Sequence, residues 1–443
     1  MRGGARADDS SLHILGLAQL GATDNLTSGE HNPTDPMAPV AEWDTYLGIR
    51  PGVLATYGTP SAIHELTYTL DATLYARHGQ YSSLFHRASW RGFFLIGPRS
   101  EVITSLEGSF GDGNLFPTVS ASSAQIGAQR SGNVETLGGA ATEDYSYQLD
   151  RDLRFTQGFT ERYDRTSTEG AGVSRASETG LRLGLDKSFR YDAMSLLVGA
   201  SYLSLERPDL GTMIAKDQIV NARGTLMYRR DVSRFWTAIG EGGAVAVLPA
   251  GGNGKAQVVP VGGASLAYFP AWGTATLSVR RDVTPNLLIA RNTLTDSGVV
   301  SCWLPLPWLQ KDPTNPELSF EGTLGYARTR LIDTDMGTVV QGFGDFVGDA
   351  AVNWNFRKNA GLSFRYQLVV QSSDTAMTSA QPVFPFVRNT VLVQFFGRWP
   401  EKLAVEVPVR NTLRVDRSNV NPVGEEVPGA NGAGATGGGS GGR

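Results

Sequence analysis

Residues 343–370 read FGDFVGDAAVNWNFRKNAGLSFRYQLVV, and this stretch decides the fold. In its first half, Phe346, Val352 and Trp354 alternate with polar residues such as Asp345 and Asn353. Successive side chains of a strand point to opposite faces, so the alternation predicts a strand with one apolar and one polar face. The polar turn RKNAG at 357–361 precedes a second alternating run, which completes a β-hairpin.

The same alternation recurs along most of the chain in runs of about 10–15 residues, longer than the usual strand of soluble sheets. We expect about eighteen strands, which a closed antiparallel transmembrane β-barrel would accommodate. Their expected ranges are 11–20, 44–57, 65–76, 84–96, 101–111, 135–149, 153–164, 177–189, 194–205, 219–228, 235–247, 258–269, 274–283, 299–304, 318–331, 343–356, 362–370 and 391–399.

Two kinds of connection alternate between the expected strands. Short turns surround Ser61, Arg99, Asp152, Tyr191, Val232, Ala271 and Lys358, and longer polar segments cover 21–43, 112–133, 165–176, 206–217, 249–255, 333–341 and 373–385. Short periplasmic turns and long extracellular loops are typical of outer-membrane barrels. An even strand number puts both chain ends on the short-turn side and lets the first and last strands pair.

Composition is compatible with such a barrel. The 443 residues are 41% hydrophobic and contain no apolar run long enough for a membrane helix. A single cysteine, Cys302, excludes a disulfide framework and a cysteine-based zinc site, and the five histidines lack metal-ligand spacing. We therefore expect no metal and no cofactor. A formal net charge of −4 gives no indication of nucleic-acid binding.

The polar face of the expected strands carries charges of both signs. Arginine near the bilayer midplane costs roughly 2–4 kcal/mol on the lipid face, so these residues are predicted to line the lumen. They are Arg50, Asp71, Arg87, Arg91, Glu107, Arg154, Arg182, Arg223, Arg280, Glu321, Asp345, Asp349 and Arg365. The set predicts a charged pore that selects solutes. For any single residue, an ion pair that only satisfies the wall is the favoured interpretation, whereas the set as a whole favours the pore.

The organisation expected from these patterns is a 1–10 periplasmic segment, an 11–399 barrel and a 400–443 tail. The tail is rich in Pro and Gly, which predicts a disordered periplasmic extension. No apolar signal-peptide core is visible at the N-terminus, although Ala5-Arg6-Ala7 has the small-x-small form of a cleavage site. A leader that is missing or already removed would reconcile these observations with the cell outer membrane.

Residues 11–399 resemble Gram-negative outer-membrane β-barrels of porin size. The strand 392–399, LVQFFGRW, resembles their C-terminal insertion signal, although here it does not end the chain. The runs 143–149 and 153–157 also resemble barrels found beside polysaccharide-export machineries of myxobacteria. That resemblance implies a conduit for a secreted polysaccharide, with periplasmic export proteins as partners beside outer-membrane lipid and lipopolysaccharide.

Three functions remain open from the sequence. The first is a polar-lined channel for solutes or a polysaccharide, and the second is a structural barrel plugged by its loop 112–133. The third is a soluble β protein such as a propeller, although no internal repeat of roughly 40–50 residues is present. An enzyme is not expected, because no G-x-S-x-G elbow precedes a helix. Gly251–Lys255 lies between strands, so it is read as a loop and not as a phosphate-binding site.

Overall fold

A computed structural model describes residues 9–27, 29, 40–59, 61–114, 133–168, 172–208, 214–250, 254–270, 272–286, 291–306, 318–333, 338–357, 359–373 and 385–400. The strands are β1 (Asp9–Thr23), β2 (Asp44–Thr59), β3 (Ala62–Tyr75), β4 (Ser83–Gly97), β5 (Ser100–Asn114), β6 (Asn133–Asp150), β7 (Leu153–Thr168), β8 (Gly172–Ser188), β9 (Asp192–Pro208), β10 (Ile214–Asp231), β11 (Trp236–Pro249), β12 (Gln257–Tyr268), β13 (Thr274–Asn286), β14 (Arg291–Pro305), β15 (Leu318–Asp333), β16 (Thr338–Arg357), β17 (Ala360–Ser373) and β18 (Phe386–Trp399). One short 3-10 helix, η1 (Gly79–Tyr81), precedes β4.

The strands form one closed antiparallel barrel of 18 strands, in which each strand pairs with its neighbours in sequence. Closure is made by β1, which pairs with β2 on one side and with β18 on the other, for example Leu17 with Phe396. A closed sheet has no free edge, so each strand can satisfy its backbone groups within the wall. The predicted fold class is confirmed.

The hairpin predicted at 343–370 is formed by β16 and β17. Its strands pair from Phe343↔Ser373 to Trp354↔Leu362, and the register shifts at the turn before Arg357↔Ala360. Phe346, Val352 and Trp354 are 36%, 38% and 48% exposed on the outer face. Asp345 and Asp349 lie on the other face, as the alternation predicts.

Strand bounds differ from the expected ones mainly at the end of the barrel that carries the longer loops, here called the loop end. The opposite end is called the short-turn end. β14 begins at Arg291 instead of 299, and β10 begins at Ile214 instead of 219. Both extensions are polar in sequence, but each is paired on the backbone with a neighbouring strand. Backbone hydrogen bonds sustain a strand without apolar alternation, which is the only signal that the sequence offers there.

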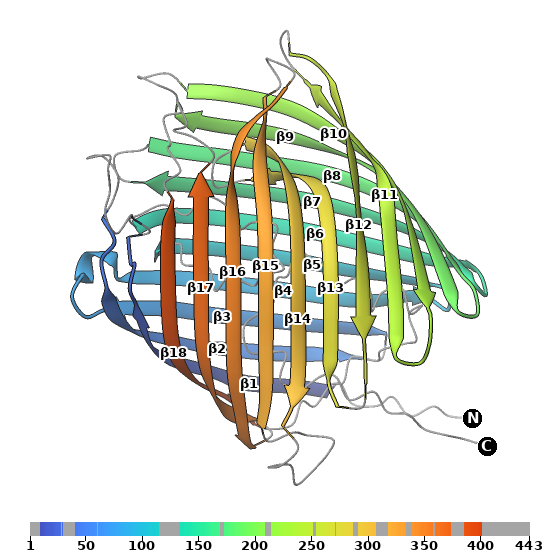
Figure 1. Ribbon diagram of the computed structural model, residues 1–443. Coiled ribbons are helices and arrows are strands. Elements are labelled where there is room, and N and C mark those ends of the chain that lie inside the picture. The colour runs from blue at the N-terminus through green and yellow to red at the C-terminus, as the bar shows by residue number, and fades with distance from the viewer. Residues whose placement is uncertain are drawn as a thin grey trace.

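The near strands β14–β18 of the barrel run steeply across its far strands β2–β8 (Figure 1). A corner forms at β10–β13, where glycines let the backbones approach closely. A Cβ on Gly243 would lie 2.1 Å from the Gly224 carbonyl oxygen, and one on Gly262 would lie 2.6 Å from that of Glu241. No larger residue fits at these two positions without moving the backbone.

Beside this corner, inward-facing residues of β8–β12 pack against residues of β13–β15 in an apolar cluster. It comprises Ala176, Leu203, Leu205, Ile219, Val245, Val247, Val259, Val261, Val283, Leu294 and Ile332, each at most 7% exposed. All these residues lie toward the loop ends of β8–β15. Burying a leucine or valine side chain contributes about 1.5–3 kcal/mol. The interior of the barrel is therefore dry and packed on this side; we call the cluster the dry core.

Candidate functional site: the charged inner wall

All thirteen charged residues predicted from the sequence lie on the inner face of the barrel by register, opposite to the exposed apolar side chains. On β2 and β3, Arg50 faces Asp71 across the pair, while the adjacent Ile49 and Leu66 are 45% and 53% exposed on the outside. On β4, Arg91 lies opposite Glu65. The structure therefore brings the set to one surface.

The inner face of β3–β8, which we call the open wall, presents charged groups that remain exposed. Asp71 contacts the Arg50 guanidinium and lies 3.8 Å from that of Arg87, whose side chain is 56% exposed. Glu107 faces Ser89 on the same wall. Asp71 thus serves two guanidiniums, of which that of Arg87 reaches toward the interior.

Three aspartates complete this charge pattern and were not among the predicted residues. Asp144 contacts Arg182, and their side chains are 45% and 55% exposed. Asp186 lies 3.3 Å from Arg154, and both are nearly buried. Asp282 contacts Arg223 and lies 2.9 Å from Arg280. Their positions in the sequence could have identified them, because each falls on the polar side of its strand's alternation.

The inner face of β15–β17 carries a second network. Arg365 lies 3.7 Å from Glu321 and 3.5 Å from Asp349, and Asp349 accepts a hydrogen bond of 2.9 Å from Gln367. Asp345, which lies four residues before Asp349 on the same face of β16, is only 1% exposed. Arg365 and Asp349 are thus mostly held within the wall, at 25% and 14% exposure, whereas Glu321 is 43% exposed.

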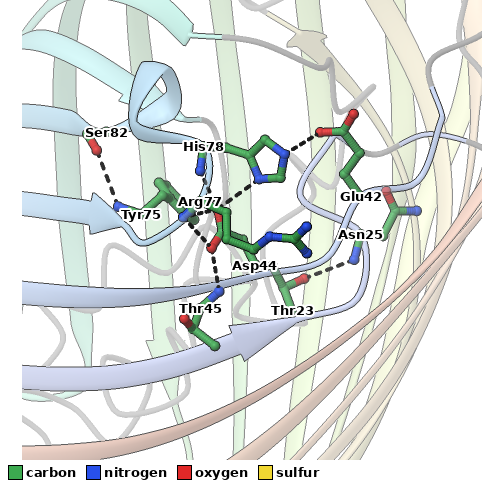
Figure 2. A network of polar contacts seen from close by, with 9 residues as sticks. All are labelled: Thr23, Asn25, Glu42, Asp44, Thr45, Tyr75, Arg77, His78 and Ser82. Carbon is green, nitrogen blue, oxygen red and sulfur yellow. Dashed lines mark hydrogen bonds and ion pairs between the residues drawn. The ribbon is translucent and has the colours of Figure 1, made fainter.

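A polar network fixes the loop-end rim above β1–β4 (Figure 2). Asp44 is fully buried and accepts hydrogen bonds from the backbone N–H groups of Thr45, Arg77 and His78. The His78 ring lies between two carboxylates, 2.9 Å from Asp44 and 2.9 Å from Glu42. Arg77 covers the Trp43 ring at 4.4 Å. The network ties the β3–β4 connection to the start of β2.

The outer face is apolar around most of the barrel. Leucine, valine and aromatic side chains there are typically 40–60% exposed, for example Leu196 at 50%, Leu324 at 55% and Phe364 at 54%. A closed barrel with an apolar outer surface is suited to a lipid bilayer and not to an aqueous solvent. Among the described residues, no helix is long and apolar enough to cross a membrane.

Comparisons with known proteins found similar chains among solved structures. No protein-family model matches the chain, and no curated protein matches its sequence. Solved structures that are similar include the siderophore receptor PirA of Pseudomonas aeruginosa, at 7% identity and TM-score 0.43, covering 87% of this chain and 80% of that one. The outer membrane protein OpdK of Pseudomonas aeruginosa is 12% identical at TM-score 0.45, covering 88% and 99%. The FrpB iron transporter of Neisseria meningitidis is 7% identical at TM-score 0.46, covering 87% and 81%.

The protein is an outer-membrane β-barrel. The closed wall and its apolar outer face carry this conclusion. In this setting the loop end is the extracellular end and the short-turn end is periplasmic. Most of the predicted N-terminal segment 1–10, of the predicted tail 400–443 and of the loop 112–133 lies outside the described residues, which lack 1–8, 401–443 and 115–132.

Proposed function

We propose that the protein is a channel for small hydrophilic solutes, with the aqueous path along the open wall of β3–β8. The observation that carries the proposal is the exposure of Arg87, Arg182 and Asp144, which remain 45–56% exposed on the inner face of a closed barrel. Charges exposed in this way are accessible to solutes in water in addition to their partners in the wall. Because both signs are present, we expect ion selectivity to be modest.

Conductance in planar bilayers tests the proposal. Wild-type protein should give steady ohmic current with weak ion preference. The double variant Arg87→Glu, Arg182→Glu should shift the reversal potential toward cation selectivity, because it reverses two exposed inner charges. Lys216→Glu is the matched control, since its side chain is exposed on the outer face and should leave the reversal potential unchanged.

A folded but silent wild type would contradict an open channel and favour the plugged, structural barrel. Folding is verified independently by the heat-dependent gel shift of intact barrels. Deleting residues 115–132 separates two kinds of silence: current after deletion identifies a plug, and continued silence of the folded deletion variant excludes a pore of either kind.

Polysaccharide export is the narrower form of this proposal. The β6–β7 hairpin carries the runs that resemble export-associated barrels, and hydroxyl groups such as Ser105 and Thr142, which share a 2.6 Å hydrogen bond, lie among the inner charges. Hydroxyl-rich surfaces suit uncharged sugar polymers. Liposomes carrying the protein should then admit oligosaccharides as well as monosaccharides of similar charge. Admission of monosaccharides alone would restrict the channel to small solutes. Periplasmic export proteins and lipopolysaccharide are proposed partners in that function.

A further inference from the structure

The wall between β12 and β13 is only partly joined. Seven positions pair there, Gly262–Tyr268 with Ala275–Arg281, whereas the other neighbouring strands pair over 10 to 17 positions. Among the described residues, 257–261 of β12 and 282–286 of β13 do not pair with each other across this seam. Pro260 and Pro285 lie in the two unpaired lengths, and proline has no N–H to contribute to a ladder. The seam thus opens toward the extracellular end.

Beyond the seam the two parts of the wall overlap. Val283, Leu294 and Ile332 continue the outward-facing rows of Val279, Val300 and Leu324, which are 49–55% exposed. Yet these three are at most 5% exposed and pack in the dry core with inward residues of β9–β12. Asn292 of β14 donates a 3.0 Å hydrogen bond to Asn221 on the inner face of β10. The extracellular end of the β13–β14 hairpin therefore lies inside β9–β12.

A charged cluster lies on the outer surface where this overlap begins, a place that we call the mouth. Arg281 is the last paired residue of β13, opposite Gly262, and its Nε lies 2.5 Å from Asp296. Arg330 contacts the same carboxylate. Two guanidiniums on one carboxylate leave one positive charge. In the described part of the chain, the buried Nε of Arg330 has no hydrogen-bond partner. Because that nitrogen is buried, what the cluster offers to an anion is its net positive charge and the more exposed guanidinium of Arg281.

We propose that this mouth binds an anionic lipid of the outer leaflet. The phosphate would lie between Arg281 and Arg330, where bidentate guanidinium contacts suit its oxygens. An acyl chain would lie along the outer surface of the seam, against the exposed side chains of Val258 and Val279. This site lies on the lipid side of the wall and is independent of conduction through the lumen.

The barrel contains a matched cluster for comparison. Glu206 on the outer face lies 3.5 Å from Arg175 and 3.1 Å from Lys216, so two cations again share one carboxylate. The strands that carry it, β8–β10, are continuously paired, with 14 and 17 positions in register. This cluster has the same net charge and also lies on the outer face, but there is no open seam between the strands that carry it.

Binding of dodecyl phosphate to the full chain in an uncharged detergent tests the site, with native mass spectrometry as the readout. Wild type should bind one molecule tightly. The triple variant Arg281→Gln, Asp296→Asn, Arg330→Gln should weaken binding at least tenfold, and Arg175→Gln, Glu206→Gln, Lys216→Gln should not change it. Excess inorganic phosphate should compete poorly, because it has no chain. Equal loss in both triples, efficient competition by inorganic phosphate, or no binding by wild type would overturn the proposal.

A second measurement locates the chain without altering the arginines. In a Cys302→Ser background, a fluorophore attached at Val258→Cys stands on the unpaired length of β12, where the side chain is 73% exposed. Stoichiometric dibromododecyl phosphate should quench it several-fold more than a fluorophore at Leu226→Cys, on the continuous outer wall. Equal quenching at the two positions would show unspecific association and would overturn the proposed site.

Discussion

The open wall of β3–β8 and the dry core of β8–β15 belong to one sheet, yet their inward side chains lie in opposite environments. On the open wall the inner positions carry charges that remain exposed, such as Arg87 and Arg182. On the other side, inner positions toward the extracellular end are Leu203, Leu205 and Val247, all at 0% exposure. The difference shows that an inward position need not face water. Strand curvature and overlap decide whether the inner surface is a channel lining or a packed core.

The largest difference in stability is expected when the same positive charge is placed in the dry core and on the open wall. Val247→Lys puts an ammonium into the dry core without a partner, which should cost about 3–5 kcal/mol and prevent assembly. Thr67→Lys on the open wall places it beside Glu65, where it should be tolerated. Unfolding in urea, followed by the heat-dependent gel shift, measures both. Similar stability of the two variants would remove the distinction between the two regions.

Ion pairs on neighbouring strands give a finer contrast within the open wall. The Arg154 and Asp186 side chains are 8% and 11% exposed, whereas those of Arg182 and Asp144 are 55% and 45% exposed. Asp186→Ala leaves a buried guanidinium without its carboxylate and should cost about 3 kcal/mol. Asp144→Ala should cost at most about 1 kcal/mol, because water replaces the lost partner. Urea titrations of the two single variants would reveal equal losses if exposure were irrelevant.

At the extracellular rim of the same region, a smaller and local effect is expected. Asp44→Ala removes the acceptor for three backbone N–H groups, which should destabilise the β3–β4 connection by about 1–3 kcal/mol without unfolding the barrel. Protease cleavage within 76–82 should accelerate, while the gel shift stays at its wild-type temperature. Thr45→Ala keeps the carboxylate and serves as the control. Unchanged cleavage in Asp44→Ala would mean that the network does not hold this connection.

The smallest effect is expected at the periplasmic turn between β6 and β7. Lys187, 2.8 Å away, donates a hydrogen bond to Asp152 and holds the pKa of that carboxyl below its ordinary value. A lowered pKa adds stability above the unfolded-state value near 3.9, and this is lost as pH falls through the folded-state value. The pair is exposed, so Asp152→Asn should only slightly flatten the acid limb of stability between pH 5 and 2. A marked flattening would show that exposure does not screen this pair.

Much of this architecture could be predicted from the alternation of side chains. Phe346 and Asp345, one residue apart, already indicate an outer and an inner face, and eighteen such runs indicate the closed barrel. The dry core could not be predicted, because Val283 and Leu294 alternate like the lipid-facing Val279 and Val300. Only pairing between strands shows that β13 leaves β12 at Arg281. Pro260 and Pro285 were the available signal for that departure, since a proline weakens a ladder wherever it falls.

The acidic partners of the inner arginines illustrate the same limit. Asp144, Asp186 and Asp282 occupy polar positions that alternation identifies, but their partners depend on register across two or more strands. Arg223 reaches Asp282 from β10 to β13, three strands away, because the wall bends sharply at its glycines. Local sequence fixes neither that bend nor the distance across it.

The distinction between an aqueous open wall and a dry opposite side is tested most directly by cysteine modification during conductance. In a Cys302→Ser background, Ser89→Cys lies on the open wall opposite Glu107, and Val245→Cys lies in the dry core at 1% exposure. A charged, membrane-impermeant methanethiosulfonate should reduce single-channel current through Ser89→Cys within seconds and leave Val245→Cys unchanged. Equal modification of the two, or modification of Val245→Cys alone, would contradict the path proposed along β3–β8.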